Sequence, residues 1–136
     1  GGGLPIGAVL VNDKLKDVLG AGTHGTTFGG NPVVCAGANA VLKKVANPAF
    51  LKEVELKGEK IRACLACCPE VKSLSGLGLM IGIELKSKKS ADVAKACLEK
   101  GLLVLTAKTK VRLLPPLTIT DEELTKGLNV LWEVLS

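Results

Sequence analysis

Hydroxyl side chains and glycines gather in one short segment of the chain, His24–Pro32, with the sequence HGTTFGGNP. The hydroxyls of Thr26 and Thr27, with backbone amides that the glycines leave accessible, can donate hydrogen bonds to phosphate oxygens. Asn31 and Pro32 are typical of the N-cap and first position of a helix, so the segment leads into a helix N-terminus. It lacks the Gly-Lys-Ser/Thr of a Walker A loop and a G-x-G-x-x-G after a strand. The residues alone leave two interpretations open, an anion site and a flexible loop.

Imidazole and thiol groups are the other candidates for chemistry, since the chain has one histidine and five cysteines. A single histidine, His24, supports neither a Ser-His-Asp arrangement nor a multi-histidine metal site, so we interpret it as a hydrogen-bonding loop residue. The Cys64–Cys68 segment (CLACC) has thiols at a spacing that can share zinc, but Cys35 and Cys97 would have to converge on it. We therefore predict buried, reduced cysteines and no metal. The odd cysteine count and the lack of a secretory leader favour the cytoplasm.

The composition excludes several classes of function. Hydrophobic residues make up 47% and charged residues 23% of the chain, as in ordinary globular domains. The basic residues that give the net charge of +5 are interspersed with acidic residues. Only 2% of residues are aromatic, which argues against nucleic-acid binding on stacked aromatic side chains. No apolar run reaches the roughly 20 residues of a membrane span. Neither nucleic acid nor membrane is an expected partner.

The pattern of apolar and chain-breaking residues predicts the elements that position these groups. In the first half we expect, in order, a buried strand over 4–11, one or two helical turns over 13–19, a loop over 20–30, a helix from 31–32 to 47–48 and an amphipathic helix over 49–68. In the second half we expect strands over 71–75 and 79–85, a helix over 87–100, strands over 102–105 and 111–114, and a helix over 124–135. Thr120 and Glu123 match a capping box before that last helix. The result is an α/β chain whose second half has the order β-β-α-β-β-α.

Five motifs, in this order, resemble those of the class III aminotransferases: GGGLPIGA, HGTTFGGNP, GLGLMIGIEL, GLLVLTA and VRLLPPLTIT. These are fold type I enzymes that depend on pyridoxal phosphate (PLP), and the resemblance covers the whole chain. It implies that the chain is the C-terminal portion of a fold type I PLP-dependent transferase. Residues 1–48 would be the end of the PLP-binding large domain and the interdomain helix, and residues 49–136 a small C-terminal α+β domain.

The resemblance also implies roles for three residues. Thr27, with Thr26 beside it, would bind the phosphate of the cofactor held by the partner subunit of a homodimer. Arg112, in the V-R-x-x-P-P motif, would bind the carboxylate of a small-molecule substrate, which suits a planar guanidinium that makes two parallel hydrogen bonds. Without the resemblance, a solvent-facing strand residue is an equally good interpretation of Arg112.

This sequence lacks the family's Schiff-base lysine, which precedes the GGG motif. It also lacks three other groups of the family: the Asp that binds the pyridine nitrogen, the aromatic residue that stacks on the cofactor ring and the phosphate-binding Gly-Ser/Thr turn. Lys14 and Lys16 are expected to be solvated and not to replace that lysine. We therefore predict no catalytic residue in this chain and no activity of the chain alone.

Within the family, the motifs are most similar to the acetylornithine aminotransferases, which move an amino group from N-acetylornithine to 2-oxoglutarate in arginine biosynthesis. Ornithine and 4-aminobutyrate aminotransferases remain alternatives. A different class of function, a non-catalytic domain that associates with itself, also remains open.

Overall fold

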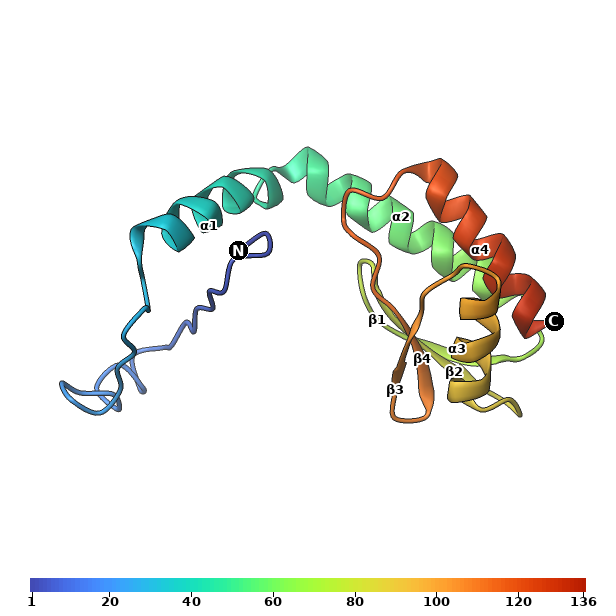
Figure 1. Ribbon diagram of the computed structural model, residues 1–136, viewed down its shortest axis with the longest axis horizontal. Coiled ribbons are helices and arrows are strands. Elements are labelled where there is room, and N and C mark those ends of the chain that lie inside the picture. Colours follow the sequence, from blue (N-terminus) through green and yellow to red (C-terminus); the bar gives the residue numbers. More distant parts are fainter. The chain divides into compact units, whose positions relative to one another are not determined.

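The computed structural model describes residues 1–136, which form two compact units, Gly1–Phe50 and Leu51–Ser136. The elements labelled in Figure 1 are α1 (Pro32–Val45), α2 (Pro48–Ala66), β1 (Val71–Leu77), β2 (Met80–Leu85), α3 (Ser90–Glu99), β3 (Leu105–Ala107), β4 (Lys110–Leu113) and α4 (Asp121–Leu135). The predicted order β-β-α-β-β-α for the second half is confirmed.

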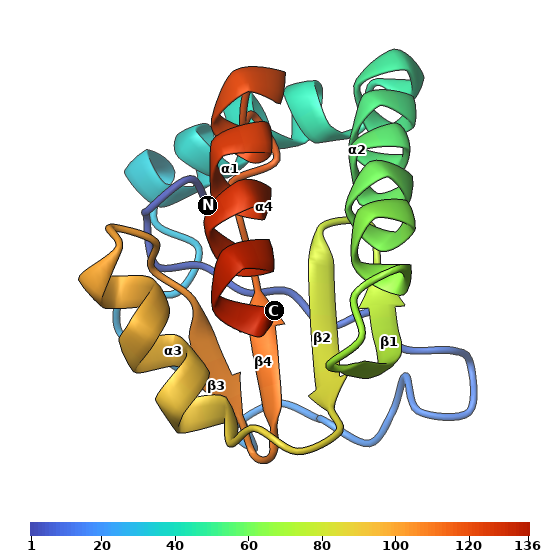
Figure 2. The same cartoon turned by 90° about the vertical axis from the view of Figure 1, so that its right-hand side faces the viewer.

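The second unit is a four-stranded sheet with helices on one face. Its strands lie in the order β1-β2-β4-β3, and every neighbouring pair is antiparallel. Figure 2 shows α2, α3 and α4 in front of this sheet. Ile81, Ile83 and Val111 are fully buried, whereas the residues that alternate with them are partly exposed. Because successive side chains of a strand point to opposite faces, the sheet has one face packed on the helices and one open face.

The hydrophobic core lies in this second unit and is aliphatic. It consists of the following buried side chains: Ile61, Leu65, Cys68, Leu79, Ile81, Ile83, Val93, Cys97, Val104, Val111, Leu124, Leu128, Leu131 and Leu135. In the unit Gly1–Phe50, by contrast, Val34 is the one buried hydrophobic residue. The free energy of apolar burial therefore comes overwhelmingly from residues 51–136.

The predicted helix start at Pro32 and the predicted capping box at Thr120 are confirmed, although α4 begins at Asp121 and not at residue 124. The Asn31 side chain accepts a hydrogen bond from Val34 N at 3.0 Å, and Pro32 occupies the first turn of α1. The capping box before α4 is also present, since Thr120 Oγ1 accepts from Glu123 N at 3.2 Å and the Glu123 carboxylate accepts from Thr120 N at 2.9 Å. Both caps satisfy amides that have no partner inside the helix.

The predicted strand over 4–11 is wrong. This segment has no regular structure and all of its residues are exposed. Strand geometry needs a neighbouring strand to satisfy its backbone groups, and the four strands of this chain, all between residues 71 and 113, pair only with one another. The segment instead touches α1 through Leu4, whose side chain lies where a Cβ on Gly37 would be.

The helical turns predicted over 13–19 are isolated turns, not a helix. Leu15 N donates to Asn12 O at 3.0 Å and Val18 N to Leu15 O at 3.1 Å. The Asn12 side chain also accepts from Lys14 N at 3.1 Å. Asparagine thus offers the backbone a local alternative to helical hydrogen bonds, as short polar side chains commonly do.

Two boundaries around α3 differ from the prediction. The helix begins at Ser90 instead of Ser87 because the Glu70 carboxylate accepts from Ser87 N at 2.7 Å and from Lys88 N at 2.6 Å, which holds this stretch as a loop. The next strand, β3, covers Leu105–Ala107 instead of 102–105. Leu102 N donates to Cys97 O at 2.9 Å, so this residue closes the end of α3 beyond Gly101 and does not enter the sheet.

Candidate functional site

The predicted loop over 20–30 is confirmed, and it presents the hydroxyls of Thr26 and Thr27 to solvent. Its side-chain hydrogen bonds run from Thr23 Oγ1 to Gly20 O at 2.7 Å and from Asn31 Nδ2 to Phe28 O at 3.0 Å. None of the hydrogen bonds of the chain involves the hydroxyl of Thr26 or Thr27. Both hydroxyls are therefore available to an external acceptor.

The helix that follows the loop offers few donors of its own. Pro32 lacks an N–H and the Asn31 side chain already binds Val34 N, so Val33 N is the one amide of the first turn without a partner. An anion at this place would depend on the threonine hydroxyls and loop amides more than on the helix terminus. The loop is tightly turned, since a Cβ on Gly29 would overlap the Thr26 methyl group and Gly30 has a φ of +68°.

Arg112 lies on β4, on the open face of the sheet in the second unit. It pairs across the sheet with Gly82 of β2 and with Leu105 of β3. Its Nε atom is buried and has no hydrogen-bond partner, and the guanidinium makes no ion pair within the chain. A buried N–H without a partner costs free energy comparable to a lost hydrogen bond. The arrangement fits a residue that binds an anionic group from outside this chain, such as a carboxylate.

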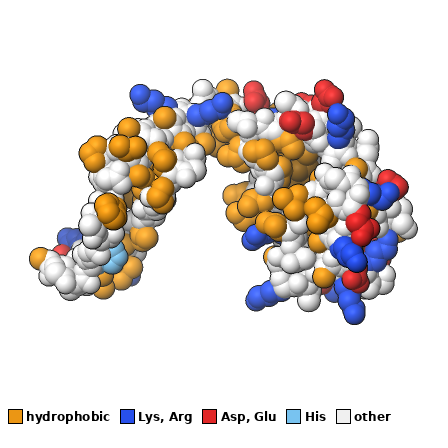
Figure 3. All heavy atoms as spheres, in the orientation of Figure 1, with side chains coloured by type: hydrophobic (Ala, Val, Ile, Leu, Met, Phe, Trp, Pro, Cys, Tyr) orange, Lys and Arg blue, Asp and Glu red, His pale blue; other side chains and the backbone are white.

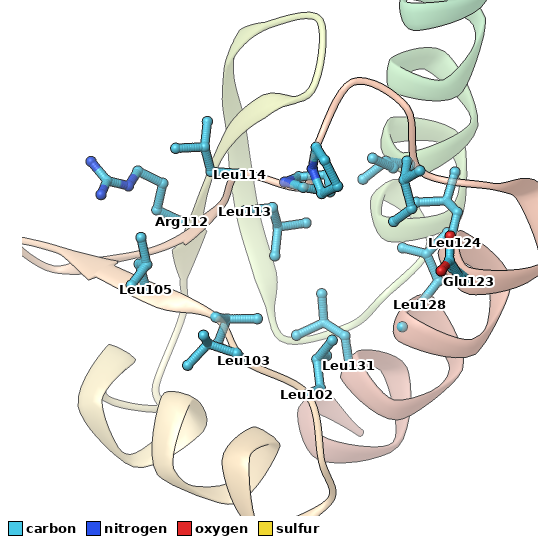
Figure 4. A pocket seen from close by; sticks show the side chains of 16 residues that line it. Leu102, Leu103, Leu105, Arg112, Leu113, Leu114, Glu123, Leu124, Leu128 and Leu131 are labelled. Atoms are coloured by element: carbon cyan, nitrogen blue, oxygen red, sulfur yellow. The ribbon is translucent and has the colours of Figure 1, made fainter. Parts of the chain in front are cut away.

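An apolar cleft of about 390 Å³ adjoins Arg112. Its lining residues are Ile61, Leu102, Leu103, Val104, Leu105, Arg112, Leu113, Leu114, Pro115, Pro116, Ile119, Glu123, Leu124, Gly127, Leu128 and Leu131. Figure 4 shows that the Arg112 guanidinium extends away from the leucines of the cleft, and Figure 3 shows hydrophobic side chains gathered on the same unit. Leu103 is 76% exposed, so part of this apolar surface is open to solvent.

An ion pair lies on the same open face as Arg112. Glu84 accepts from Lys72 Nζ at 2.7 Å and from Ser73 Oγ at 2.8 Å. The Lys72 hydrogen bond and charge, with the Ser73 hydroxyl, hold the pKa of Glu84 below its usual value. The same pair raises the pKa of Lys72. The negative charge of Glu84 is therefore paired with Lys72, and Glu84 forms no ion pair with Arg112.

Sequence reasoning missed Lys110, whose Nζ donates to Ser75 Oγ at 3.0 Å on this face. The predicted strand began at residue 111 and left Lys110 out. Residues two apart on a strand share a face, so a strand that begins at Lys110 places it on the same face as Arg112.

The structure corrects two interpretations of single residues. His24 is exposed and its ring takes part in none of the hydrogen bonds of the chain, so it is not the hydrogen-bonding loop residue we expected. The cysteines are free thiols as predicted, but Cys67 is exposed and Cys35 and Cys64 are only half-buried. Cys68 and Cys97 are buried, and burial raises the pKa of the Cys97 thiol.

Two lysines and the possible metal ligands are the remaining candidate chemical groups. Lys14 and Lys16 are exposed, and no three His, Cys, Asp or Glu side chains gather in a way that could hold a metal ion. Each helix is too short or too polar to cross a bilayer.

Comparison with known proteins agrees with the motifs. Acetylornithine aminotransferase of Haemophilus ducreyi is 58% identical to this chain over 136 residues, which are 99% of this chain and 34% of that protein. The mitochondrial acetylornithine aminotransferase of Alnus glutinosa is 44% identical over 98% of this chain and 31% of its own length. The ornithine aminotransferase of Toxoplasma gondii, whose crystal structure has partial occupancy of PLP at the active site, superimposes with a TM-score of 0.76 at 35% identity, covering 88% of this chain and 30% of that one.

This chain thus spans about a third of the length of the relatives it matches. Its fold is that of a portion of the PLP-dependent aminotransferases. Residues 1–135 match the family model described as Aminotransferase class-III. The chain belongs to the class III aminotransferase family.

Proposed function

We propose that this chain is the C-terminal part of a PLP-dependent aminotransferase that moves an amino group from N-acetylornithine to 2-oxoglutarate, as in arginine biosynthesis. The 58% identity with a protein named acetylornithine aminotransferase over 99% of the chain supports this substrate. The observation that carries the proposal in the structure is Arg112, a cation with a buried donor and no partner inside the chain, as expected of a residue that binds a substrate carboxylate.

Residues 1–48 are proposed to be the end of the large PLP-binding domain with its interdomain helix, and residues 49–136 the small C-terminal domain. The separation of the chain into Gly1–Phe50 and Leu51–Ser136 and the location of the core in the second unit support this division. The small core content of residues 1–48 fits a segment that completes a larger domain.

Thr26 and Thr27 are proposed to donate hydrogen bonds to the cofactor phosphate of the partner subunit, which makes the parent enzyme a homodimer. Their exposed hydroxyls, free of other hydrogen bonds, fit that role. When bound, PLP supplies an electron sink for the carbanion formed at the substrate. This chain would hold the phosphate and orient the substrate carboxylate through Arg112, and it would supply no catalytic proton acceptor of its own.

The proposed location is the cytoplasm, on the basis of the reduced cysteines. A mitochondrial relative exists in Alnus glutinosa, so organelle location is the alternative. Fractionation of the source cells, with detection of the protein by antibody, would distinguish the two.

A chimera tests the function. The corresponding last third of the Haemophilus ducreyi enzyme is replaced by this chain, and transamination of N-acetylornithine, ornithine and 4-aminobutyrate with 2-oxoglutarate is measured. We expect N-acetylornithine to be the best donor, and Arg112→Ala to lower kcat/KM by about 100-fold or more, because a charge-assisted bidentate contact is lost. A folded, PLP-loaded chimera that prefers ornithine would favour the ornithine aminotransferases instead.

The chain alone is expected to be inactive with PLP and to show no visible absorption band of a bound cofactor. The alternative function, a self-associating domain without catalysis, predicts a monodisperse oligomer of the chain and a chimera that folds but transfers no amino group to 2-oxoglutarate.

A further inference from the structure

Three of the five cysteines of the chain lie within five residues at the C-terminal end of α2. Cys64 belongs to the helix and is half-buried against the core, Cys67 is exposed, and Cys68 is a buried core residue. All three are free thiols, and no set of metal ligands gathers around them. The proposed aminotransferase function gives none of them a role, so the cluster is a candidate for separate thiol chemistry.

Cys64 and Cys67 are spaced so that a disulfide can join them. Cys67 directly follows Ala66, the last residue of α2. Cys68 N donates to Leu65 O at 3.0 Å, so the chain continues to turn through Cys67. Residues three apart in a helical turn have Cα atoms about 5 Å apart, inside the range of about 4.4–6.8 Å that disulfides span. Their Cβ atoms are about 5–6 Å apart, against about 3.5–4.5 Å in a disulfide, so bond formation tightens the turn by about 1–2 Å.

The chain that follows the cluster, from the end of α2 into β1, is held in place (Figure 2). Lys86 Nζ donates to Pro69 O at 2.6 Å, and the Glu70 carboxylate accepts hydrogen bonds from two backbone amides of the loop before α3. Pro69 also cannot continue the helix, because it has no N–H to donate. The movement that closes a disulfide ring therefore falls on the last turn of α2 and not on β1.

Exposure distinguishes the reactivity of the five thiols. Exchange with a disulfide from solution requires access to the protein sulfur, and this access is open at Cys67, since the other four cysteines are half-buried or buried. Burial also raises the pKa of the Cys97 thiol, which lowers the fraction of reactive thiolate at that core position. An incoming disulfide therefore reaches Cys67 first. Cys64, nearly one helical turn earlier, is the neighbouring thiol placed to complete the exchange.

We propose that Cys64 and Cys67 form a reversible redox site at the end of α2, with low-molecular-weight disulfides such as glutathione disulfide as the oxidant. The Cys67 thiolate attacks one sulfur of the small disulfide, forms a mixed disulfide with it and releases the first glutathione as a thiolate. The Cys64 thiolate then attacks the Cys67 sulfur, forms the Cys64–Cys67 disulfide and releases the second glutathione.

The exchange balances without a further reactant. The two protein thiols give up two electrons and their two protons, and the small disulfide is reduced to two thiols. Because the Cys67 sulfur is exposed, a small thiol can attack the protein disulfide and reverse both steps.

The test uses the full 136-residue chain under native conditions. Reduced protein is incubated with glutathione disulfide, the reaction is quenched with acid, and the remaining thiols are alkylated in denaturant. Trypsin leaves the three clustered cysteines in one peptide, residues 63–72, and the other two cysteines in separate peptides, so mass spectrometry distinguishes them. We expect peptide 63–72 to lose two hydrogen atoms and to carry one alkyl group, on Cys68, about tenfold sooner than the other peptides react. Dithiothreitol should reverse the change.

Three variants separate the two steps. Cys64→Ser should stop the reaction after the first step, so that peptide 63–72 retains one glutathione on Cys67. Cys67→Ser should slow the oxidation of this peptide by about tenfold or more, because no exposed thiol is left. Cys35→Ser, at a half-buried thiol on α1, is the matched control and should react as wild type. Circular dichroism reports whether each variant is folded.

Three results with the wild-type chain would overturn the proposal, whether or not the variants fold. The first is a lasting glutathione adduct on Cys67 with Cys64 still alkylated, since the ring then does not close. The second is a disulfide that joins two chains, seen as a dimer on a non-reducing gel, since Cys64 is then not the partner thiol. The third is equal oxidation of all three peptides, since exposure then gives no selectivity. PLP and Arg112 take no part in these measurements, so failure here leaves the proposed aminotransferase function intact.

Discussion

At the scale of single residues, the arrangement of Lys110 and Arg112 is governed by their spacing. Side chains two residues apart on a strand lie about 7 Å apart, where two unit charges repel by about 2 kcal/mol at an effective dielectric constant of 20 and by well under 1 kcal/mol in water. Ser75 draws the Lys110 ammonium across Gly82 and so away from Arg112. The repulsion is small because the face is open to water.

Glu70 is a second residue whose role follows from its contacts. Its carboxylate accepts from Ser87 N, Ser87 Oγ and Lys88 N at 2.6 to 2.9 Å. The backbone hydrogen bonds from Lys88 and Ser87 hold the pKa of Glu70 below its usual value. Hydrogen bonds to the charged form stabilise that form, so the loop before α3 is held by an ionised carboxylate.

This arrangement predicts a pH dependence. A carboxylate with a lowered pKa in the folded state adds stability above its pKa in the unfolded chain, and this stability is lost as pH falls through the folded value. Glu70→Gln should therefore lower the free energy of unfolding at pH 7, and the difference from wild type should shrink as pH falls below about 4. Urea denaturation at pH 7, 5 and 3 measures it.

Glu53→Gln is the matched control, since Glu53 makes no hydrogen bond or ion pair. Glu53→Gln should have the same free energy of unfolding as wild type at each pH. A Glu70→Gln variant with a constant deficit from pH 7 to pH 3 would show that the charge of Glu70 is irrelevant to the loop.

At the scale of elements, close approaches of backbone decide which residues the helices tolerate. α2 packs against the turn of the β1–β2 hairpin through Gly58, where a Cβ would lie 2.6 Å from Gly78 O. α4 contains a second interior glycine, Gly127, where a Cβ would lie 3.4 Å from Leu102 Cδ1, an ordinary van der Waals contact. Both glycines lie inside a helix, but a Cβ would clash with backbone at Gly58 and make an ordinary contact at Gly127.

Alanine at these glycines should therefore have opposite effects. In a helix interior, Gly→Ala stabilises by up to about 1 kcal/mol. Gly127→Ala should give about this gain, whereas at Gly58 the clash with a backbone oxygen outweighs it and Gly58→Ala should destabilise by about 1–3 kcal/mol. Equilibrium urea unfolding of both variants measures the two values against wild type. Equal stabilisation by both would mean that α2 does not approach the hairpin as closely as the structure has it.

At the scale of the whole molecule, elements stabilised by local interactions could be predicted from the sequence, whereas those that depend on distant partners could not. The capped helices at Asn31-Pro32 and Thr120 were predicted because their signals are local. The strands that form the β1–β2 hairpin were predicted, over 71–75 and 79–85, because each is a short apolar run bounded by turn residues. The prediction of a strand over 4–11 was wrong because an apolar, β-branched run forms a strand only where a partner strand exists, and none lies beside it in this chain. The side-chain bridge from Lys110 to Ser75 needed the sheet order, which no local pattern contains.

Because the core lies in the unit Leu51–Ser136, it predicts which backbone amides exchange slowly with solvent hydrogen. Residues 51–136 hold nearly all buried apolar side chains, so their central strands should open only with global unfolding, and the amides of Ile81, Ile83 and Val111 should exchange most slowly. Residues 4–19 have exposed side chains and only isolated turn hydrogen bonds. Their amides should exchange within about tenfold of the unstructured rate, as expected where local opening costs little. Hydrogen exchange of the full chain by NMR measures both groups in one experiment. Slow exchange over 4–11 that vanishes on dilution would instead mean that this segment finds a strand partner in another copy, because an unpaired apolar edge is a site for strand addition.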